Sequence, residues 1–394
     1  TIVGGAGHVG VPLALAFTNA HFNVSIIDRN KEALQKLKDG VLPFQEEGAE
    51  DALKQALAAN RLSFGTEPQH MALSGPVIIT IGTPVDVYGS PQRGVIQECV
   101  SELLWCLNPE QLLVLRSTVY PGTTQEIDAY LTQRIGEGVV KLAYCPERII
   151  QGRGLEEIAT LPQIVSGTTQ AAVEEAAQLF SAIAPELVFV KTPLEAELAK
   201  LFTNAYRSIM FAAANQFYEI AEAAGVDYRN VFHAMKHNYP RAEHIPSPGF
   251  VGGPCLPKDL DQLLAFASEK LPGAYENLLR PTREMNVDML QRVVSKVEDQ
   301  IQAAGGLDRV GLLGMSFKAD SDDRRGSMGY NLKDLLEEAG HTVKATDPYI
   351  PDDPTLSPLP TVIQQSNVLV LCAPHTEYKH LPFDGKPIID IWGH

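Results

Sequence analysis

One cysteine lies in a segment whose composition would make its thiol reactive. Cys255 follows a glycine-rich stretch, residues 249–253, and precedes Lys258 and Asp259, where leucines at helical spacing predict the start of a helix. Glycines let a ligand approach the backbone closely. The positive end of a helix and a neighbouring lysine both lower the pKa of a thiol. The segment therefore predicts a nucleophilic thiolate at Cys255; the alternative is a buried structural cysteine beside a packing loop.

Two residues of a long helical pattern and one residue after a strand pattern are further candidates for catalysis. Lys200 and Asn204 are four residues apart and therefore share one helix face. An ammonium and an amide on that face would stabilise a developing alkoxide. Glu147 follows an apolar strand pattern and is a candidate general base. The alternatives are a solvated lysine, an ordinary helical asparagine, and a surface ion pair between Glu147 and Arg148.

The first residues carry a pattern typical of dinucleotide binding. Gly5, Gly7 and Gly10 form a GxGxxG motif between a strand pattern and an apolar helix pattern, and Asp28 ends the next strand pattern, residues 24–27. Such glycines let a pyrophosphate reach the helix N-terminus, while the acid accepts from the ribose 2′-OH and repels a 2′-phosphate. The motif predicts bound NAD rather than NADP; a tight turn without a ligand is the alternative.

The elements that must position these residues are apolar runs that each end in a polar turn. Open parallel sheets bind ligands at the carboxyl ends of their strands, so we expect these turns to line a ligand site. The runs are residues 77–81, 112–115 and 141–144, and the turns carry Thr83 and Pro84, Ser117 and Thr118, and Glu147 and Arg148. For the Ser-Thr pair, capping of the next helix is the alternative role.

A long apolar helical pattern at residues 193–224 is followed by more helix and then by a second strand-turn-helix pattern near residue 310. Thirty-odd residues span about 45 Å, and a helix that is apolar nearly all round must be covered, so we expect it to join domains and to form a homodimer. The sequence predicts an α/β fold with two Rossmann-like doubly wound parallel-sheet domains joined by a long central helix. The expected boundaries are 1–190 (dinucleotide-binding), 191–304 (central helical region with the catalytic cysteine) and 305–394 (second Rossmann-like domain).

Composition restricts the partners. The net charge of −16 argues against nucleic acid and anionic membrane surfaces, because phosphate binding needs cations. The five cysteines are an odd number without metal-ligand spacing, which favours a reducing cytoplasm and no metal site. No apolar run approaches the ~20 residues of a membrane span. In so acidic a chain, the cations Lys318, Arg324 and Arg325 after a strand pattern would suit a diphosphate.

Seven segments taken in order resemble the nucleotide-sugar 6-dehydrogenases, the family of the UDP-glucose, GDP-mannose and UDP-N-acetylhexosamine dehydrogenases. They are residues 5–10, 82–84, 117–119, 145–148, Lys200 with Asn204, 252–259 and 317–325. The resemblance implies an NAD-binding Rossmann domain, a central dimerisation region and a UDP-binding Rossmann-like domain. It also implies a four-electron oxidation of the sugar C6 alcohol to a carboxylate with two NAD.

The resemblance also implies a role for each matching residue. Cys255 is the nucleophile, Lys200 and Asn204 stabilise oxyanions, Asp259 takes part in proton transfer, and Glu147 assists thioester hydrolysis. Cofactor contacts are implied for Gly5, Gly7, His8, Val9, Gly10, Asp28, Thr83, Pro84, Ser117, Arg325 and Thr118, which also positions catalytic water. Substrate contacts are implied for Glu147, Arg148, Lys200, Asn204, Arg241, Gly249, Phe250, Gly252, Gly253 and Lys318.

Some positions depart from the family pattern or bear on the sugar. His8 replaces the aromatic residue usual in the first glycine loop. Asp390 is followed by Ile391 and Trp392, where many members carry an arginine just after an Asp-Gly pair. Pro-Glu-Arg with Gln151, instead of Pro-Glu-Phe with a later acid, favours a UDP-N-acetylhexosamine, either mannosamine or glucosamine. UDP-glucose is the alternative, because the sequence at 256–259 also occurs in enzymes for that sugar.

Two readings from other functional classes remain open on the sequence alone. A two-electron hydroxyacid dehydrogenase also uses a lysine and an asparagine on a helix after a Rossmann domain, and it would make Cys255 dispensable. A non-catalytic NAD-binding protein is the second, although the presence of Cys255, Lys200, Asn204 and Glu147 together argues against it.

Overall fold

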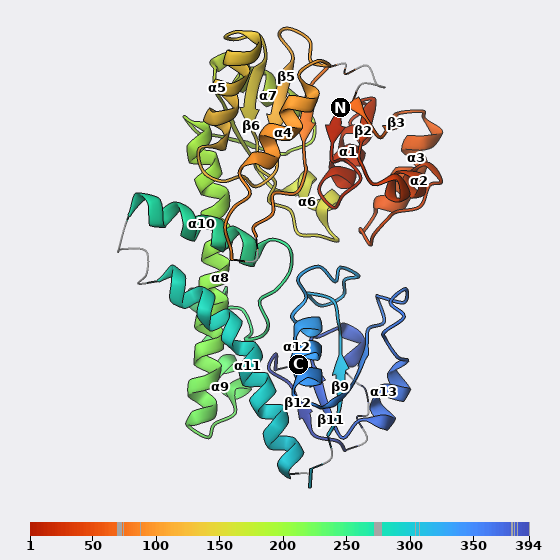
Figure 1. Cartoon of the computed structure of the whole chain (residues 1–394), viewed down its shortest axis with the longest axis vertical. Coiled ribbons are helices and arrows are strands. Elements are labelled where there is room, and N and C mark those ends of the chain that lie inside the picture. Colours follow the sequence, from red (N-terminus) through yellow and green to blue (C-terminus); the bar gives the residue numbers. More distant parts are fainter. Residues whose placement is uncertain are drawn as a thin grey trace. The chain divides into compact units, whose positions relative to one another are not determined.

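The computed structural model describes residues 1–68, 73, 75–86, 88–271, 278–303, 305–306, 308–379, 381, 383 and 385–393. The chain divides into two compact units (Figure 1). The first unit contains residues 1–203 and 261–266, and the second contains 204–260 and 267–394. Each unit is described by itself below.

A mainly parallel sheet forms the centre of the first unit. Its strands are β1 (Ile2–Val3), β2 (Val24–Ile27), β3 (Leu62–Gly65), β4 (Val77–Ile79), β5 (Leu112–Leu115), β6 (Lys141–Tyr144), β7 (Gln163–Gly167) and β8 (Leu187–Phe189). Within the described residues, the order is β3-β2-β1-β4-β5-β6-β7-β8, and only the β6–β7 pair is antiparallel. The order up to β6 is that of the doubly wound dinucleotide-binding sheet.

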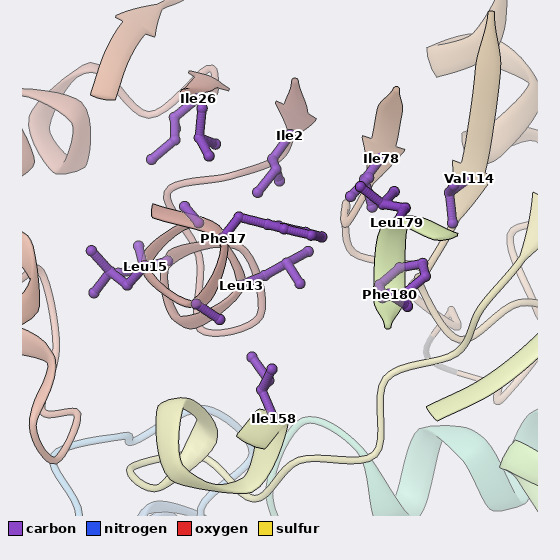
Figure 2. Close-up of a cluster of buried hydrophobic side chains, with 14 of the residues drawn as sticks. Ile2, Leu13, Leu15, Phe17, Ile26, Ile78, Val114, Ile158, Leu179 and Phe180 are labelled. Atoms are coloured by element: carbon purple, nitrogen blue, oxygen red, sulfur yellow. The ribbon is translucent and has the colours of Figure 1, made fainter. Parts of the chain in front are cut away.

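Helices cover this sheet, and α1 is enclosed on all sides. The helices are α1 (Gly10–Asn19), α2 (Lys31–Lys38), α3 (Ala49–Ala58), α4 (Gly94–Leu103), α5 (Thr123–Ile135), α6 (Gly154–Thr160) and α7 (Gln170–Phe180). Figure 2 shows Leu13 and Phe17 of α1 among Ile2 of β1, Ile158 of α6 and Phe180 of α7. An apolar helix with few polar positions is stable only when buried in this way, and this burial fixes the glycine loop at its N-terminus.

The second unit combines long helices with a smaller sheet. The helices are α8 (Pro193–Ala223, which begins in the first unit), α9 (Tyr228–Lys236), α10 (Leu256–Lys270), α11 (Leu279–Ala303), α12 (Met328–Glu338) and α13 (Leu359–Gln365). The strands are β9 (Arg309–Leu313), β10 (Thr342–Thr346), β11 (Val368–Leu371) and β12 (Ile388–Ile389), all parallel in the order β10-β9-β11-β12. Val293 and Val297 of α11 belong to the same buried apolar cluster as Val310 and Leu312 of β9.

The predicted fold class is confirmed: a doubly wound, mainly parallel sheet precedes one long helix in the chain, and a second, parallel sheet follows it. Three strands that the sequence did not indicate are β3, β7 and β8. One bound also differs: β4 ends at Ile79 rather than at 81. In the part of the chain that the structure describes, no helix has both the length and the apolarity to cross a membrane.

Candidate active site

The glycine loop between β1 and α1 has the backbone that a pyrophosphate needs. A side chain on Gly10 would collide with the Gly5 backbone, so these two glycines allow the strand end and the helix to approach closely. Beside Gly7 only the Gly4 carbonyl oxygen, at 3.8 Å, comes within 4 Å of where a Cβ would lie. The loop is thus tight on its protein side and open at Gly7, which fits the approach of a dinucleotide to the N-terminus of α1.

Asp28 is held at this loop from the end of β2. Its Oδ2 accepts the Ala6 N–H at 3.0 Å, and its Oδ1 accepts the Asn30 N–H at 2.9 Å. The carboxylate is only half-buried, so it retains capacity to accept from a ribose hydroxyl. His8 stacks on Phe44 with ring centroids 3.8 Å apart. The two residues are far apart in the sequence, and the glycine motif does not predict their contact. Val9 precedes the first residue of α1.

The turns after β4 and β5 are bonded to each other, because these strands are parallel neighbours. The Thr83 hydroxyl donates to the Thr118 carbonyl, and the Ser117 hydroxyl donates to the Ile81 carbonyl at 2.7 Å. Thr118 is half-buried and Pro84 is exposed. The structure therefore brings together, at one sheet edge, the four turn residues that the sequence singled out.

Glu147 is engaged by a buried arginine that the sequence reasoning missed. Arg116, at the end of β5, pairs with Glu147 Oε2 and donates to Gln163 Oε1 at 2.8 Å. Glu147 Oε1 accepts the N–H groups of Arg148 and Ile149 at 2.7 and 3.1 Å. Both oxygens already accept hydrogen bonds, so a water activated by Glu147 would share an oxygen with one of these donors. In the sequence, the feature that could have indicated Arg116 was a charged residue directly after an apolar strand.

The Arg148 guanidinium is already bonded within the protein. Its Nη2 donates to the Pro162 carbonyl. Burial lowers the pKa of Arg148, and the charge of Glu147 opposes that effect. To contact the substrate, as the sequence predicts, Arg148 would have to exchange its bond to the Pro162 carbonyl for one with the ligand.

In the second unit, the first turn of α10 combines an exposed thiol with a buried carboxylate. Cys255 directly precedes the helix and is exposed and reduced. Asp259 is fully buried; its Oδ2 accepts the Asn204 Nδ2–H at 2.6 Å and its Oδ1 is 2.8 Å from Lys258 Nζ. Two of the predicted catalytic residues, Asn204 and Asp259, thus meet across α8 and α10, and Cys255 lies one helical turn before Asp259. Lys200, one turn before Asn204 on α8, is 8% exposed.

A buried amide network holds the glycine-rich segment that leads to Cys255. Asn215 accepts the Gly249 N–H at 2.8 Å and donates to the Gly249 carbonyl at 3.1 Å. Asn286 of α11 donates to the Ser208 carbonyl and lies 3.4 Å from Asn215. The spacing i, i+4 and i+11 puts Asn204, Ser208 and Asn215 on one face of α8. Polar residues on one face of an otherwise apolar helix were the feature of the sequence that could have indicated this network.

The glycines of this segment are required by packing inside the protein. Gly253 has φ +87°, and a Cβ there would lie 2.5 Å from the Phe317 ring. A Cβ on Gly252 would lie 2.5 Å from the Gly326 carbonyl oxygen, and one on Gly249 would collide with the Trp392 indole. Their open sides are filled by side chains and backbone of the C-terminal domain, whereas the sequence reasoning had expected room for a ligand.

The cationic residues after β9 are half-exposed or exposed. Lys318 lies 6.0 Å from the centre of the Phe317 ring. Arg325 is fixed by Asp323, which accepts from its Nε and Nη2 at 2.9 and 2.7 Å. Burial lowers the pKa of Arg325, but the bond and charge of Asp323 and the charge of Cys255 outweigh it and raise that pKa.

Two further predicted substrate contacts are Phe250, which lies within the 249–253 segment, and Arg241, which precedes it in the chain. Phe250 is buried and meets the Trp392 ring edge-on, with centroids 6.2 Å apart. Arg241 is exposed in the 3-10 helix η2 (Pro240–Ala242), and among the described residues no hydrogen bond joins it to Asn204, Cys255 or Asp259. The same part of the chain contains no group of three His, Cys, Asp or Glu placed to hold a metal ion.

Comparison with known proteins places the whole chain in one family. The UDP-glucose/GDP-mannose dehydrogenase family is matched by its NAD binding domain over residues 1–184, its central domain over 194–288 and its UDP binding domain over 311–393. The chain belongs to this family. It is an NAD-dependent nucleotide-sugar dehydrogenase, which confirms the enzyme class and the cofactor predicted from the sequence.

Archaeal proteins are among the most similar relatives. A UDP-N-acetyl-D-mannosamine dehydrogenase of Pyrococcus horikoshii is 27% identical over 96% of this chain and 90% of its own. A solved structure of the UDP-D-ManNAc dehydrogenase from that organism has a TM-score of 0.90 at 26% identity and covers 98% of this chain and 93% of its own. A UDP-glucose dehydrogenase of Pyrobaculum islandicum has a TM-score of 0.89 at 26% identity, with 99% and 93% covered.

Proposed function

We propose that the enzyme oxidises the C6 hydroxymethyl group of a UDP-N-acetylhexosamine, mannosamine or glucosamine, to the uronate. The relatives named for UDP-N-acetyl-D-mannosamine and the Pro-Glu-Arg sequence at 146–148 support this sugar class. The observation that carries the chemistry is the exposed Cys255 one turn before the buried, Asn204-bonded carboxylate of Asp259.

The chain's residues account for the covalent part of the reaction. Bound NAD would supply the hydride acceptor for both oxidation stages at the sugar C6. Cys255 Sγ adds to the aldehyde carbon after the first stage and forms a thiohemiacetal, which prevents escape of the aldehyde. Loss of the second hydride converts the thiohemiacetal to a thioester, and water then cleaves the thioester to release the carboxylate and the thiol. The second amide hydrogen of Asn204 and the Lys200 ammonium stabilise the negative oxygen at C6. Asp259 takes part in proton transfer, and Glu147 and Thr118 place the hydrolytic water.

Binding follows the two sheets. NAD is held by the loop of Gly5, Gly7 and Gly10 with Asp28, and by the turns that contain Thr83 and Thr118. The UDP-sugar is held by the Gly249–253 segment and Lys318, with contributions from Arg148 and Arg241. We propose functional boundaries at 1–190, 191–304 and 305–394.

We further propose that the enzyme is a cytoplasmic homodimer formed through α8. Four large apolar side chains on α8 are exposed, at 54%, 58%, 40% and 60%: Phe202, Tyr206, Phe217 and Ile220. Such a row is costly in water and is typical of an interface. Ile220→Lys should shift the mass measured by light scattering from dimer to monomer, whereas Lys296→Gln should not. A monomeric wild type would reject the dimer, and enzyme recovered outside the cytoplasm in cell fractions would reject the location.

A panel of UDP-sugars tests the substrate and the number of electrons transferred. UDP-N-acetylmannosamine, UDP-N-acetylglucosamine, UDP-N-acetylgalactosamine and UDP-glucose are each supplied as the limiting reagent, and NADH is followed by absorbance. We expect two NADH per UDP-N-acetylhexosamine and no free aldehyde. A yield of one NADH would reject the four-electron reaction, and preferred turnover of UDP-glucose would transfer the proposal to that sugar.

A further inference from the structure

The sheet of the second unit brings the loops after β9 and β11 together at one edge. Leu313 and Leu371, the last residues of these parallel strands, are paired in register. The chain passes from β9 to β10 on one side, and β11 lies on the other side of β9. Open α/β sheets bind ligands where the strand order reverses in this way. The edge between β9 and β11 is therefore where the geometry favours the nucleotide.

A fully buried histidine that the proposed chemistry does not use lies at this edge. His375, four residues after β11, is 0% exposed. Its Nδ1 accepts the Asp320 N–H at 2.8 Å, and its Nε2 lies 3.0 Å from Asp347 Oδ2. Because Nδ1 is the acceptor, the proton of the neutral ring belongs on Nε2, which donates to Asp347. His375 therefore links the loop after β9 to the carboxylate that follows β10.

Asp347 is an equally constrained partner for His375. Its Oδ2 also accepts the N–H groups of Met315 and Ser316 at 2.6 and 2.9 Å, and its Oδ1 accepts that of Tyr349 at 2.8 Å. Burial alone would raise the pKa of Asp347, but these bonds and His375 lower it. The carboxylate is thus a fixed anchor, and the orientation of His375 is set by it.

The segment that His375 holds contains Lys318. The Ser316 hydroxyl donates to the Lys318 carbonyl at 2.7 Å. Two residues later, Asp320 adopts φ +53°, a left-handed conformation that costs a non-glycine residue energy and needs external support. Asp320 receives that support from His375 and from Thr376, whose N–H and hydroxyl donate to its carboxylate at 2.8 and 2.7 Å. Lys318 thus lies between two tethered residues.

We propose that His375 is a positioning residue for the UDP-sugar: it fixes the 316–320 loop in the shape that presents Lys318 to the diphosphate. The proposal rests on the proposed function in that a UDP-sugar is the substrate. A loop that is ordered before binding loses no conformational entropy when the ligand binds. The order that His375 imposes therefore appears as a higher affinity for the nucleotide. His375 acts through the loop and has no part in the oxidation at C6.

The test compares three substitutions of His375 in the full-length enzyme. In His375→Asn, the side-chain oxygen can still accept the Asp320 N–H; in His375→Gln, the longer amide reaches Asp347 instead; in His375→Leu, both bonds are lost. The dissociation constant of UDP is measured by calorimetry, and KM and kcat are measured for the preferred UDP-sugar. We expect UDP binding about tenfold weaker and a similarly raised KM in His375→Leu, with kcat within about threefold. His375→Asn should recover most of the affinity, and His375→Gln little.

A second histidine serves as the matched control. His341 precedes β10 in the same unit and is half-buried, and His341→Asn should leave UDP binding and KM unchanged. Wild-type affinity in His375→Leu, or equal affinities in the Asn and Gln variants, would overturn the proposal. If His375→Leu does not fold, Ser316→Ala decides, because it removes the hydroxyl that donates to the Lys318 carbonyl and lies 3.4 Å from His375 Nε2; an unchanged UDP dissociation constant would then overturn the proposal. A wild-type enzyme that does not bind UDP would instead reject the proposed function.

Discussion

Removal of the Asn204 amide should weaken both the fold of the second unit and catalysis. In Asn204→Ala, the buried Asp259 carboxylate loses a donor at 2.6 Å but keeps Lys258 at 2.8 Å. A hydrogen bond to a charged group contributes about 1.5–3 kcal/mol. Because one partner remains, we expect the free energy of unfolding to fall by about 2 kcal/mol. Loss of an oxyanion donor should also lower kcat by roughly 10²–10³.

The two tryptophans allow the stability change to be assigned to the second unit. Trp105 is 92% exposed in the first unit, so Trp105→Phe should be harmless, and the fluorescence then reports Trp392, which packs on Gly249. Urea unfolding is measured in this background for the Asn204→Ala and Thr203→Ala variants. Thr203 is exposed on the same helix and its hydroxyl donates to the Ala199 carbonyl of its own helix, so its loss should cost little.

Asn204→Asp separates hydrogen bonding from side-chain volume. The new carboxylate keeps the shape of the amide but faces Asp259 Oδ2, so the two acids must share a proton, as close carboxylate pairs do. A shared proton means pKa values raised by folding, so this variant should gain stability relative to wild type as the pH falls. A change below 0.5 kcal/mol in Asn204→Ala, together with kcat within threefold of wild type, would refute the reasoning.

Three further outcomes follow from single features of the fold. Iodoacetamide at neutral pH should modify the exposed Cys255 well before Cys145, because burial raises the pKa of Cys145 to about 12; peptide mass spectrometry measures the order of labelling. Gly253→Ala should lower the free energy of unfolding by more than about 2 kcal/mol, because the new Cβ would meet an aromatic ring. Gly225, at φ +70°, has no atom within 4 Å of where a Cβ would lie, so Gly225→Ala should lower it by about 1 kcal/mol. A tyrosine hydroxyl bond lowers the pKa of Asp353 from 3.8 to about 2. The free energy of unfolding of Asp353→Asn should therefore be about 1–2 kcal/mol below that of the wild type at pH 7. In denaturation curves, this difference should shrink as the pH falls from about 4 towards 2.

The sequence indicated most of the elements that are buried on both faces, although it did not indicate β7, which is buried at every residue. β2, β5 and β6 were located to the residue, because a central parallel strand is a short apolar run that ends in a polar turn. β3 and β8 lie towards the edges and are partly exposed, so they lack that pattern. The antiparallel pairing of β6 and β7 depends on contacts that no local pattern encodes.

The site was predictable by residue type but not by contact. The order of the motifs indicated Cys255, Asn204 and Asp259, yet the bond between Asn204 and Asp259 joins residues 55 positions apart and is visible only in the fold. The need for glycine at position 253 likewise comes from a tertiary contact, because the ring of Phe317 occupies the space that a side chain would take. Arg116 was overlooked because a charge after a strand usually lies in solvent, whereas here it is buried against Glu147.

Covalent attachment of the sugar to Cys255 tests the central claim most directly. The enzyme is mixed with NAD and excess UDP-N-acetylhexosamine, quenched in acid during turnover, digested, and analysed by mass spectrometry. The account predicts a UDP-uronyl adduct on the peptide that contains Cys255, absent from Cys255→Ser and from enzyme without NAD. Full turnover by Cys255→Ser, or a carboxylate product formed without any adduct on that peptide, would contradict it.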